Sequence, residues 1–187
     1  MPSLKNNCNY WKLAVAVVFT CYYIFYATGD PSHAYANWNL IDSVDLVIHE
    51  AGHTIFRIFG EFIYIFGGSL TQVLLPCIFA GYFFVRRQYF SGSVLLFWVA
   101  QNILYVATYM GDSIRQQLPL LGGDNVIHDW NYLLTHMGLL QYTDLLSGLT
   151  RYFGFCLIVC AGVLCLFFSF EAPLRQKLLN YLMRRSA

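Results

Sequence analysis

The stretch YFGFCLIVCAGVLCLFFSF, residues 152–170, contains no charged side chain and is long enough to cross a lipid bilayer as one helix. A transmembrane α-helix needs about 17 to 25 predominantly apolar residues. Three further segments approach that length without an Asp, Glu or Arg, at residues 11–27, 70–85 and 92–110. We therefore predict an all-α integral membrane protein with four transmembrane helices.

The composition of the whole chain supports this class. The sequence is 58% hydrophobic and only 11% charged, whereas about 25% of the residues of an average soluble domain are charged. A surface with so few charges suits contact with lipid. The net charge of +1 provides no basic field that would attract nucleic acid. We expect one membrane domain over residues 1–187, with the lipid bilayer as a partner and no nucleic acid.

Positive charges in short loops mark the cytoplasmic side of a membrane protein. In this chain they fall before the first predicted span, between the second and third spans, and after the last span: Lys5, Lys12, Arg86, Arg87, Arg175, Lys177, Arg184 and Arg185. Arg115 and Arg151 fall in the connection 111–151 instead, but they form no cluster. This pattern predicts that both termini are cytoplasmic and that residues 111–151 form an outer loop. The tail, residues 173–187, has leucines on one face and predicts an amphipathic helix on the cytoplasmic surface.

Residues 41–66 form a fifth apolar region, which ionisable side chains interrupt. Both ends of this region must lie outside if four other segments cross, so it is not expected to be a simple crossing. We predict a helix over about 42–60 that is inserted from the extracytoplasmic side or lies against the other helices. Its polar residues recur at spacings of three and four and so share one face: Asp42, Asp45, His49, His53 and Arg57.

Residues 49–53, HEAGH, are an HExxH motif. On a helix the two histidines are four residues apart, hence on one face and close enough to bind the same metal ion. Imidazole nitrogen suits zinc, so we expect His49 and His53 to supply two ligands to one zinc ion. Glu50 could take a proton from a water molecule at the metal. Asp45, one turn earlier, could orient the second nitrogen of His49.

A third protein ligand should come from the extracytoplasmic connections. We rank His128 first and Asp124 second, with Asp129, His136, Glu61 and His33 as further candidates. Asp129 could instead orient a ligand ring. Tyr132 or His136 could alternatively stabilise an oxyanion. The polar residues inside the spans, Gln72, Gln101 and Asn102, are expected to bond neighbouring helices. Of these, Gln72 is the best placed to approach the site, because its span begins on the same side of the membrane.

The HEAGH motif on a membrane-associated helix resembles the intramembrane zinc metallopeptidases of the site-2-protease type. That resemblance implies that His49 and His53 bind zinc and that Glu50 activates water. The family takes its third ligand from the aspartate of an LDG-type motif. Here the nearest string is LPLLGGD, residues 118–124, in which the order of glycine and aspartate is reversed. The resemblance therefore covers the motif helix and does not extend to an LDG motif.

The function that we expect first is a zinc-dependent membrane metallopeptidase, with Glu50 as general base, acting on a membrane-associated or exported polypeptide. The first alternative is a non-catalytic metal-binding protein that serves as an accessory subunit of a larger complex, with a closed four-ligand shell. The second is a metal hydrolase acting on a lipid or another amphiphile. The partner is accordingly a polypeptide substrate or a partner subunit, besides lipid.

Overall fold

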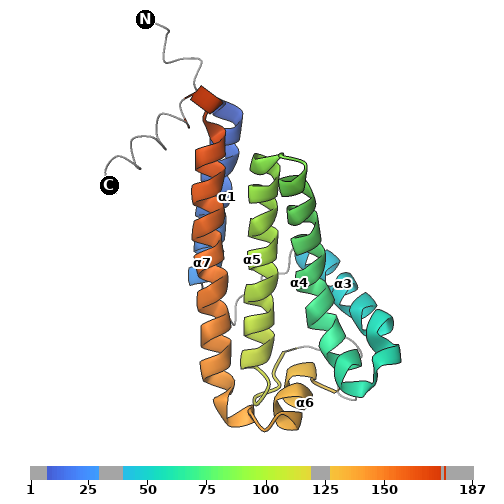
Figure 1. Ribbon diagram of the computed structural model, residues 1–187. Helices are drawn as coiled ribbons and strands as arrows, with labels where there is room; N and C mark the ends of the chain where they lie inside the picture. The colour runs from blue at the N-terminus through green and yellow to red at the C-terminus, as the bar shows by residue number, and fades with distance from the viewer. Residues whose placement is uncertain (1–7, 30–39, 119–126, 174, 176–187) are drawn as a thin grey trace, which may run out of the picture.

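The computed structural model describes residues 8–29, 40–118, 127–173 and 175. Its helical elements, in chain order, are α1 (Tyr10–Thr28), α3 (Leu40–Phe56), the 3-10 turn η2 (Arg57–Phe59), α4 (Glu61–Val85), α5 (Tyr89–Gly111), α6 (Asp129–His136), the 3-10 turn η4 (Leu140–Tyr142) and α7 (Thr143–Ser169). Among these residues no β-strand forms, which confirms the all-α class. Figure 1 shows the long helices side by side, with α6 across one end.

Four helical segments are long and apolar enough to cross a membrane: α1, α4, α5, and α7 together with η4. They correspond to the four predicted spans. Two of them begin earlier than the hydropathy pattern indicated, α4 at Glu61 and α7 at Thr143. The reason is that Glu61 and Asp144 each lie in the first turn of a helix, where the helix dipole stabilises a negative charge. The connection 111–151, expected as a loop, therefore contains α6, η4 and the start of α7.

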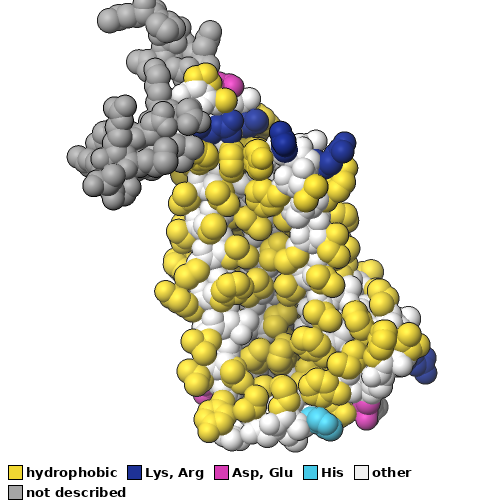
Figure 2. All heavy atoms as spheres, in the orientation of Figure 1, with side chains coloured by type: hydrophobic (Ala, Val, Ile, Leu, Met, Phe, Trp, Pro, Cys, Tyr) yellow, Lys and Arg dark blue, Asp and Glu magenta, His cyan; other side chains and the backbone are white. Residues whose placement is uncertain are grey.

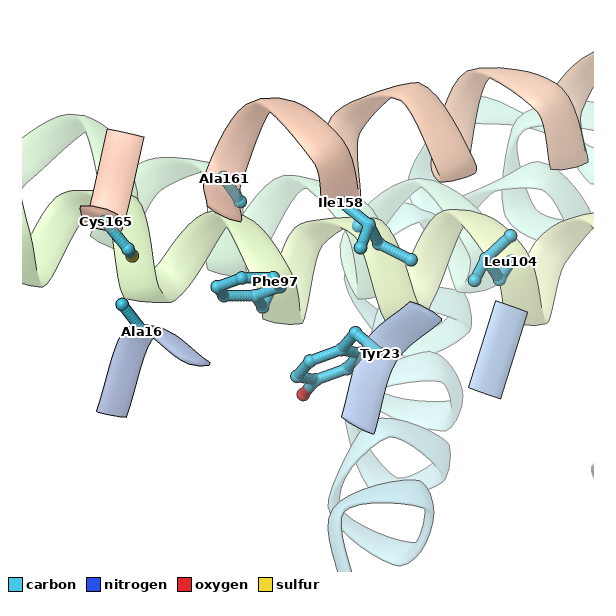
Figure 3. Close-up of a cluster of buried hydrophobic side chains, with 8 residues drawn as sticks. Ala16, Tyr23, Phe97, Leu104, Ile158, Ala161 and Cys165 are labelled. Carbon is cyan, nitrogen blue, oxygen red and sulfur yellow. The ribbon is translucent and has the colours of Figure 1, made fainter. Parts of the chain in front are cut away.

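Helix α5 lies at the centre of the bundle and packs against α1, α4 and α7. In its most apolar stretch 61% of the residues are buried, compared with 17% in α1. Figure 3 shows side chains of α1, α5 and α7 meeting around Phe97, which is fully buried. Gly154 and Gly162 let α7 approach its neighbours closely, since a Cβ at either position would crowd Leu104 or Thr20. Small residues at such contacts are typical of helix packing in membranes.

Helix α3 is not one of the four candidate spans. It packs against α4, and Figure 1 shows it beside the part of α4 that is nearer to α6. At Gly52 the two helices are so close that a Cβ would overlap the carbonyl oxygen of Gly67. This placement agrees with the prediction that the interrupted segment lies against the other helices.

The two ends of the described chain meet at one end of the bundle. The amide of Asn9 donates a hydrogen bond to the carbonyl of Ser169 over 2.9 Å. The turn between α4 and α5, which contains Arg86 and Arg87, lies at this same end (Figure 1). Figure 2 shows Lys and Arg side chains gathered there, with apolar side chains covering the face below them. The described residues of the positive loops therefore share one end, and their cytoplasmic location stays a prediction. Most of the predicted tail helix, 173–187, lies outside the described residues.

Candidate metal centre

Two histidines of α3 and one aspartate of α6 point at a single spot. His49 and His53 are one turn apart, and their ring centroids are separated by 4.8 Å. Oδ2 of Asp129 lies 2.9 Å from Nε2 of His49 and 3.3 Å from Nε2 of His53. One ligand atom from each residue lies within 4.8 Å of the other two. The three residues, called the His-His-Asp group below, are buried or half-buried and could hold a metal ion.

The opposite nitrogen of each imidazole is bonded to an oxygen. Nδ1 of His49 is 3.1 Å from Oε1 of Gln72, and Nδ1 of His53 is 2.9 Å from the backbone carbonyl of Tyr64. Amide oxygens only accept hydrogen bonds, so each Nδ1 must donate. In a neutral ring Nε2 then carries a lone pair, and both lone pairs face the carboxylate of Asp129. Three acceptor atoms in such proximity need a cation between them, either a proton or a metal ion.

Gly68 of α4 provides the space in which the imidazoles meet. A Cβ at this position would lie 2.6 Å from Nε2 of His49 and 2.6 Å from Nε2 of His53. Real Cβ atoms do not come so close to a neighbouring atom. The missing side chain therefore keeps open the side of the rings that carries the ligand nitrogens, and this open space fits a bound ion.

The electrostatics of the group match this geometry. Burial lowers the pKa of His53, but its hydrogen bonds to Asp129 and to the Tyr64 carbonyl, with the nearby charge of Glu50, outweigh burial and raise that pKa. Burial raises the pKa of Asp129, but its bonds to the two histidines outweigh burial and lower that pKa. The site thus favours an ionised carboxylate and attracts positive charge, as a metal centre requires.

The start of α6 determines which residue reaches the histidines. His128 is the N-cap of α6, and its Nδ1 accepts the backbone N–H of Asn131 over 3.2 Å. The backbone N–H of Asp129 donates to the hydroxyl of Tyr109 over 3.2 Å. Capping thus engages Nδ1 of His128 within α6, whereas the Asp129 carboxylate reaches the two histidines of α3. The third member of the group is Asp129, although the sequence ranked His128 first.

His128 faces Asp112 instead. Its Nε2 lies 3.5 Å from Oδ2 of Asp112, which is close enough for an ion pair. The contact lacks the geometry of a hydrogen bond, and this buried Nε2 has no hydrogen-bond partner among the described residues. Burial lowers the pKa of His128, and the charge of Asp112 offsets part of that effect. The ring also lies against Tyr109, with centroids 4.4 Å apart. His128 therefore fixes the α5–α6 junction next to the group.

The other predicted site residues lie around the group or apart from it. Asp45 does not orient His49: its Oδ1 accepts the indole N–H of Trp98 over 2.8 Å, and Gln72 occupies Nδ1 of His49 instead. Gln72, which the sequence favoured over Gln101 and Asn102 as a residue near the site, thus contacts it. Tyr132 and His136 stack on each other, with ring centroids 5.7 Å apart. Asp124 and His33 lie outside the described residues.

Glu50 is exposed on α3 beside the group. Its charge is close enough to contribute to the raised pKa of His53. Because Glu50 follows His49 directly, it projects from the helix at about 100° to the ligand face. It therefore borders the group without joining it, in a position accessible from outside the protein.

Three contributors to the site were missed from the sequence: Gly68, the carbonyl of Tyr64 and the hydroxyl of Tyr109. The pair Gly67-Gly68 in an otherwise apolar helix was a usable signal, since paired small residues mark close helix contacts in membranes. No signal pointed to the other two, because a backbone carbonyl is present at every residue and tyrosine is abundant in this chain. Comparison of the chain with protein-family models, with curated proteins and with solved structures finds no match.

Proposed function

We propose that this protein is a zinc-dependent membrane metallopeptidase. The observation that carries the proposal is the convergence of two histidine Nε2 atoms and one carboxylate oxygen beside an exposed glutamate of the same HExxH motif. Two histidines and a carboxylate are a common ligand set of catalytic zinc. Three protein ligands leave the fourth tetrahedral position for water or substrate, whereas structural zinc sites are closed by four protein ligands.

The roles of the residues follow from their positions. His49, His53 and Asp129 would hold zinc, and Gln72 and the Tyr64 carbonyl would keep the two rings in the tautomer that binds it. Zinc, when bound, polarises a peptide carbonyl and makes water more acidic. Glu50 would act as general base, taking a proton from water and passing it to the leaving amine. Its exposure supports this role, since a base must reach a substrate that arrives from outside the site.

The position of the site in the bundle supports a membrane-associated polypeptide as substrate. The His-His-Asp group is built from α3 and α6, and α6 lies at the end of the bundle opposite to the chain ends and the Arg86-Arg87 turn (Figure 1). With cytoplasmic termini, this end faces the extracytoplasmic side. A polypeptide at the outer leaflet would then reach Glu50 along the exposed face of α3, where Val47, Ala51 and Thr54 are also exposed.

The test is hydrolysis of a membrane-anchored polypeptide by the purified protein in lipid nanodiscs, with zinc content measured in parallel. We expect Glu50→Gln to retain zinc and to lower the rate by about 100-fold or more, since general bases contribute about 10²–10⁴-fold. Glu171→Gln is the matched control, because Glu171 is exposed and follows α7 at the other end of the protein. Equal rates for wild type and Glu50→Gln would refute the mechanism. Bound zinc without hydrolysis of any polypeptide would favour the accessory-subunit alternative.

A further inference from the structure

Two amide side chains in the interior of the bundle each leave one atom unpaired. Gln72 of α4 and Asn102 of α5 are both fully buried. Oε1 of Gln72 accepts from His49, while Nδ2 of Asn102 donates to the carbonyl of Trp98 over 3.0 Å, and the Asn102 side chain lies near the Asp45 carboxyl. Nε2 of Gln72 and Oδ1 of Asn102 have no hydrogen-bond partner in the part of the chain that the structure describes. Buried amide atoms are rarely left unpaired, so both require an explanation.

Gln72 and Asn102 lie at the same junction of α3, α4 and α5. Phe79 of α4 stacks on Trp98 of α5, with ring centroids 6.3 Å apart, so these two residues lie at the same level of the antiparallel pair. Gln72 lies two turns from Phe79, toward the metal centre. Asn102 lies about one turn from Trp98 in the same direction. On α3 their partners, His49 and Asp45, are also one turn apart. Both amides therefore border one short section of the junction.

We propose that an ordered water molecule binds in this junction, accepting a hydrogen bond from Nε2 of Gln72 and donating one to Oδ1 of Asn102. The two unpaired atoms are a donor and an acceptor, and water satisfies both at once. A metal cation would not satisfy both atoms, because the amide N–H group of Gln72 would point at it. An acyl chain would leave both atoms unpaired. The carboxyl of Asp45, which is 1% exposed and lies near Asn102, is a further partner of the kind that buried waters use.

This water has a consequence for the metal centre, which rests on the proposed function. By bonding Nε2 of Gln72, it holds the amide with Oε1 toward Nδ1 of His49, so Nε2 of His49 keeps its lone pair for zinc. Asn102 thus becomes a positioning residue that acts on the metal through water, Gln72 and His49. Its neighbour Gln101 is equally buried but donates to Asp42 and accepts from Tyr23, so it belongs to a separate set of bonds.

The first test is a structure of the wild-type protein at a resolution that shows water. We expect density within hydrogen-bond distance of Gln72 Nε2 and Asn102 Oδ1. A junction without density, or one filled by a protein group, would overturn the proposal. This test needs neither activity nor bound metal, so it is decided even if the protein fails to bind zinc, an outcome that would refute the proposed function alone.

The second test compares Asn102→Leu with Gln101→Leu, its matched control, in zinc affinity measured by chelator competition and in the tautomer of His49 measured by nitrogen NMR of the zinc-loaded protein. We expect Asn102→Leu to weaken zinc binding about tenfold, at the lower end of the 10–100-fold range for outer partners of metal ligands, and to mix the tautomers. Gln101→Leu should leave both unchanged. Equal losses in the two variants, or no loss in Asn102→Leu, would overturn the positioning role.

Discussion

Gly68→Ala is the substitution that tests the metal centre most directly. The added methyl carbon would lie 2.6 Å from Nε2 of both His49 and His53, whereas ordinary contacts begin at about 3.4 Å. Each imidazole must therefore withdraw by about 0.8 Å, or α4 must move away from α3. Metal–ligand distances tolerate only about 0.2 Å. The methyl group would also occupy part of the space next to the ligand nitrogens.

The expected effect is a loss of zinc affinity of about 100-fold or more. A misplacement of about 1 Å in an active site can lower its reaction rate about 100-fold, and we expect a comparable factor for zinc binding. A factor of 100 corresponds to about 2.7 kcal/mol. The helix itself should not suffer, because alanine is favoured over glycine in a helix by about 1 kcal/mol. Gly68→Ala should therefore fold, and it should be specifically impaired in binding zinc.

The assay is competition between the protein and a chromophoric chelator for zinc, with thermal unfolding measured in excess chelator. Gly81→Ala is the matched control, because Gly81 lies in the same helix and a Cβ there would meet nothing within 4 Å. We expect Gly81→Ala to bind zinc like the wild type. If Gly68→Ala also bound zinc like the wild type, the ion could not lie between the two Nε2 atoms and the assignment of the site would be refuted.

Two further predictions concern the third ligand and pH. Asp129→Asn should lower zinc affinity by at least about tenfold, whereas His128→Asn should change it little, because asparagine is also a good N-cap; chelator competition would contradict the assignment if His128→Asn had the larger effect. Zinc affinity should also fall as the pH is lowered. The fall should begin at a higher pH than it would for a site built from histidines of ordinary pKa. The sign follows because the pKa of His53 is raised, protonated imidazole cannot bind metal, and protons therefore compete at Nε2 as the pH falls. A zinc affinity independent of pH between 6 and 8, measured by titration calorimetry, would contradict this prediction; this interval is chosen around the ordinary histidine pKa of about 6.5.

The sequence was sufficient to predict the class of fold, because the length of an apolar segment directly reflects the thickness of a bilayer. It placed the start of α4 too late, near residue 70. Glu61 and the Gly67-Gly68 pair interrupt the hydropathy pattern, but in the structure Glu61 lies in the first turn of α4 and the glycines contact α3. Hydropathy reports contact with lipid and does not report contact between two helices.

The pairing of His49 and His53 was likewise predictable, since spacing along one helix fixes which residues share a face. The choice between His128 and Asp129 was not. The two residues are adjacent in sequence, and they differ in their relation to the first turn of α6. His128 caps that turn through Nδ1, so the neighbouring carboxylate reaches the histidines. A capping interaction of this kind depends on where a short helix begins, which composition does not determine to within one residue.

The separation of His49 and Asp129 along the chain has a consequence for biosynthesis. The polar face of α3 is buried against residues that are made later: Gln72 in α4, Trp98 and Gln101 in α5, and Asp129 in α6. When α3 leaves the ribosome none of these partners exists, and two buried aspartates would oppose its entry into lipid. We therefore expect the segment to wait at the membrane surface until α4 and α5 have been inserted, and the full His-His-Asp group to form only after α6 has been synthesised. Loading of the ion would then mark the completion of the fold.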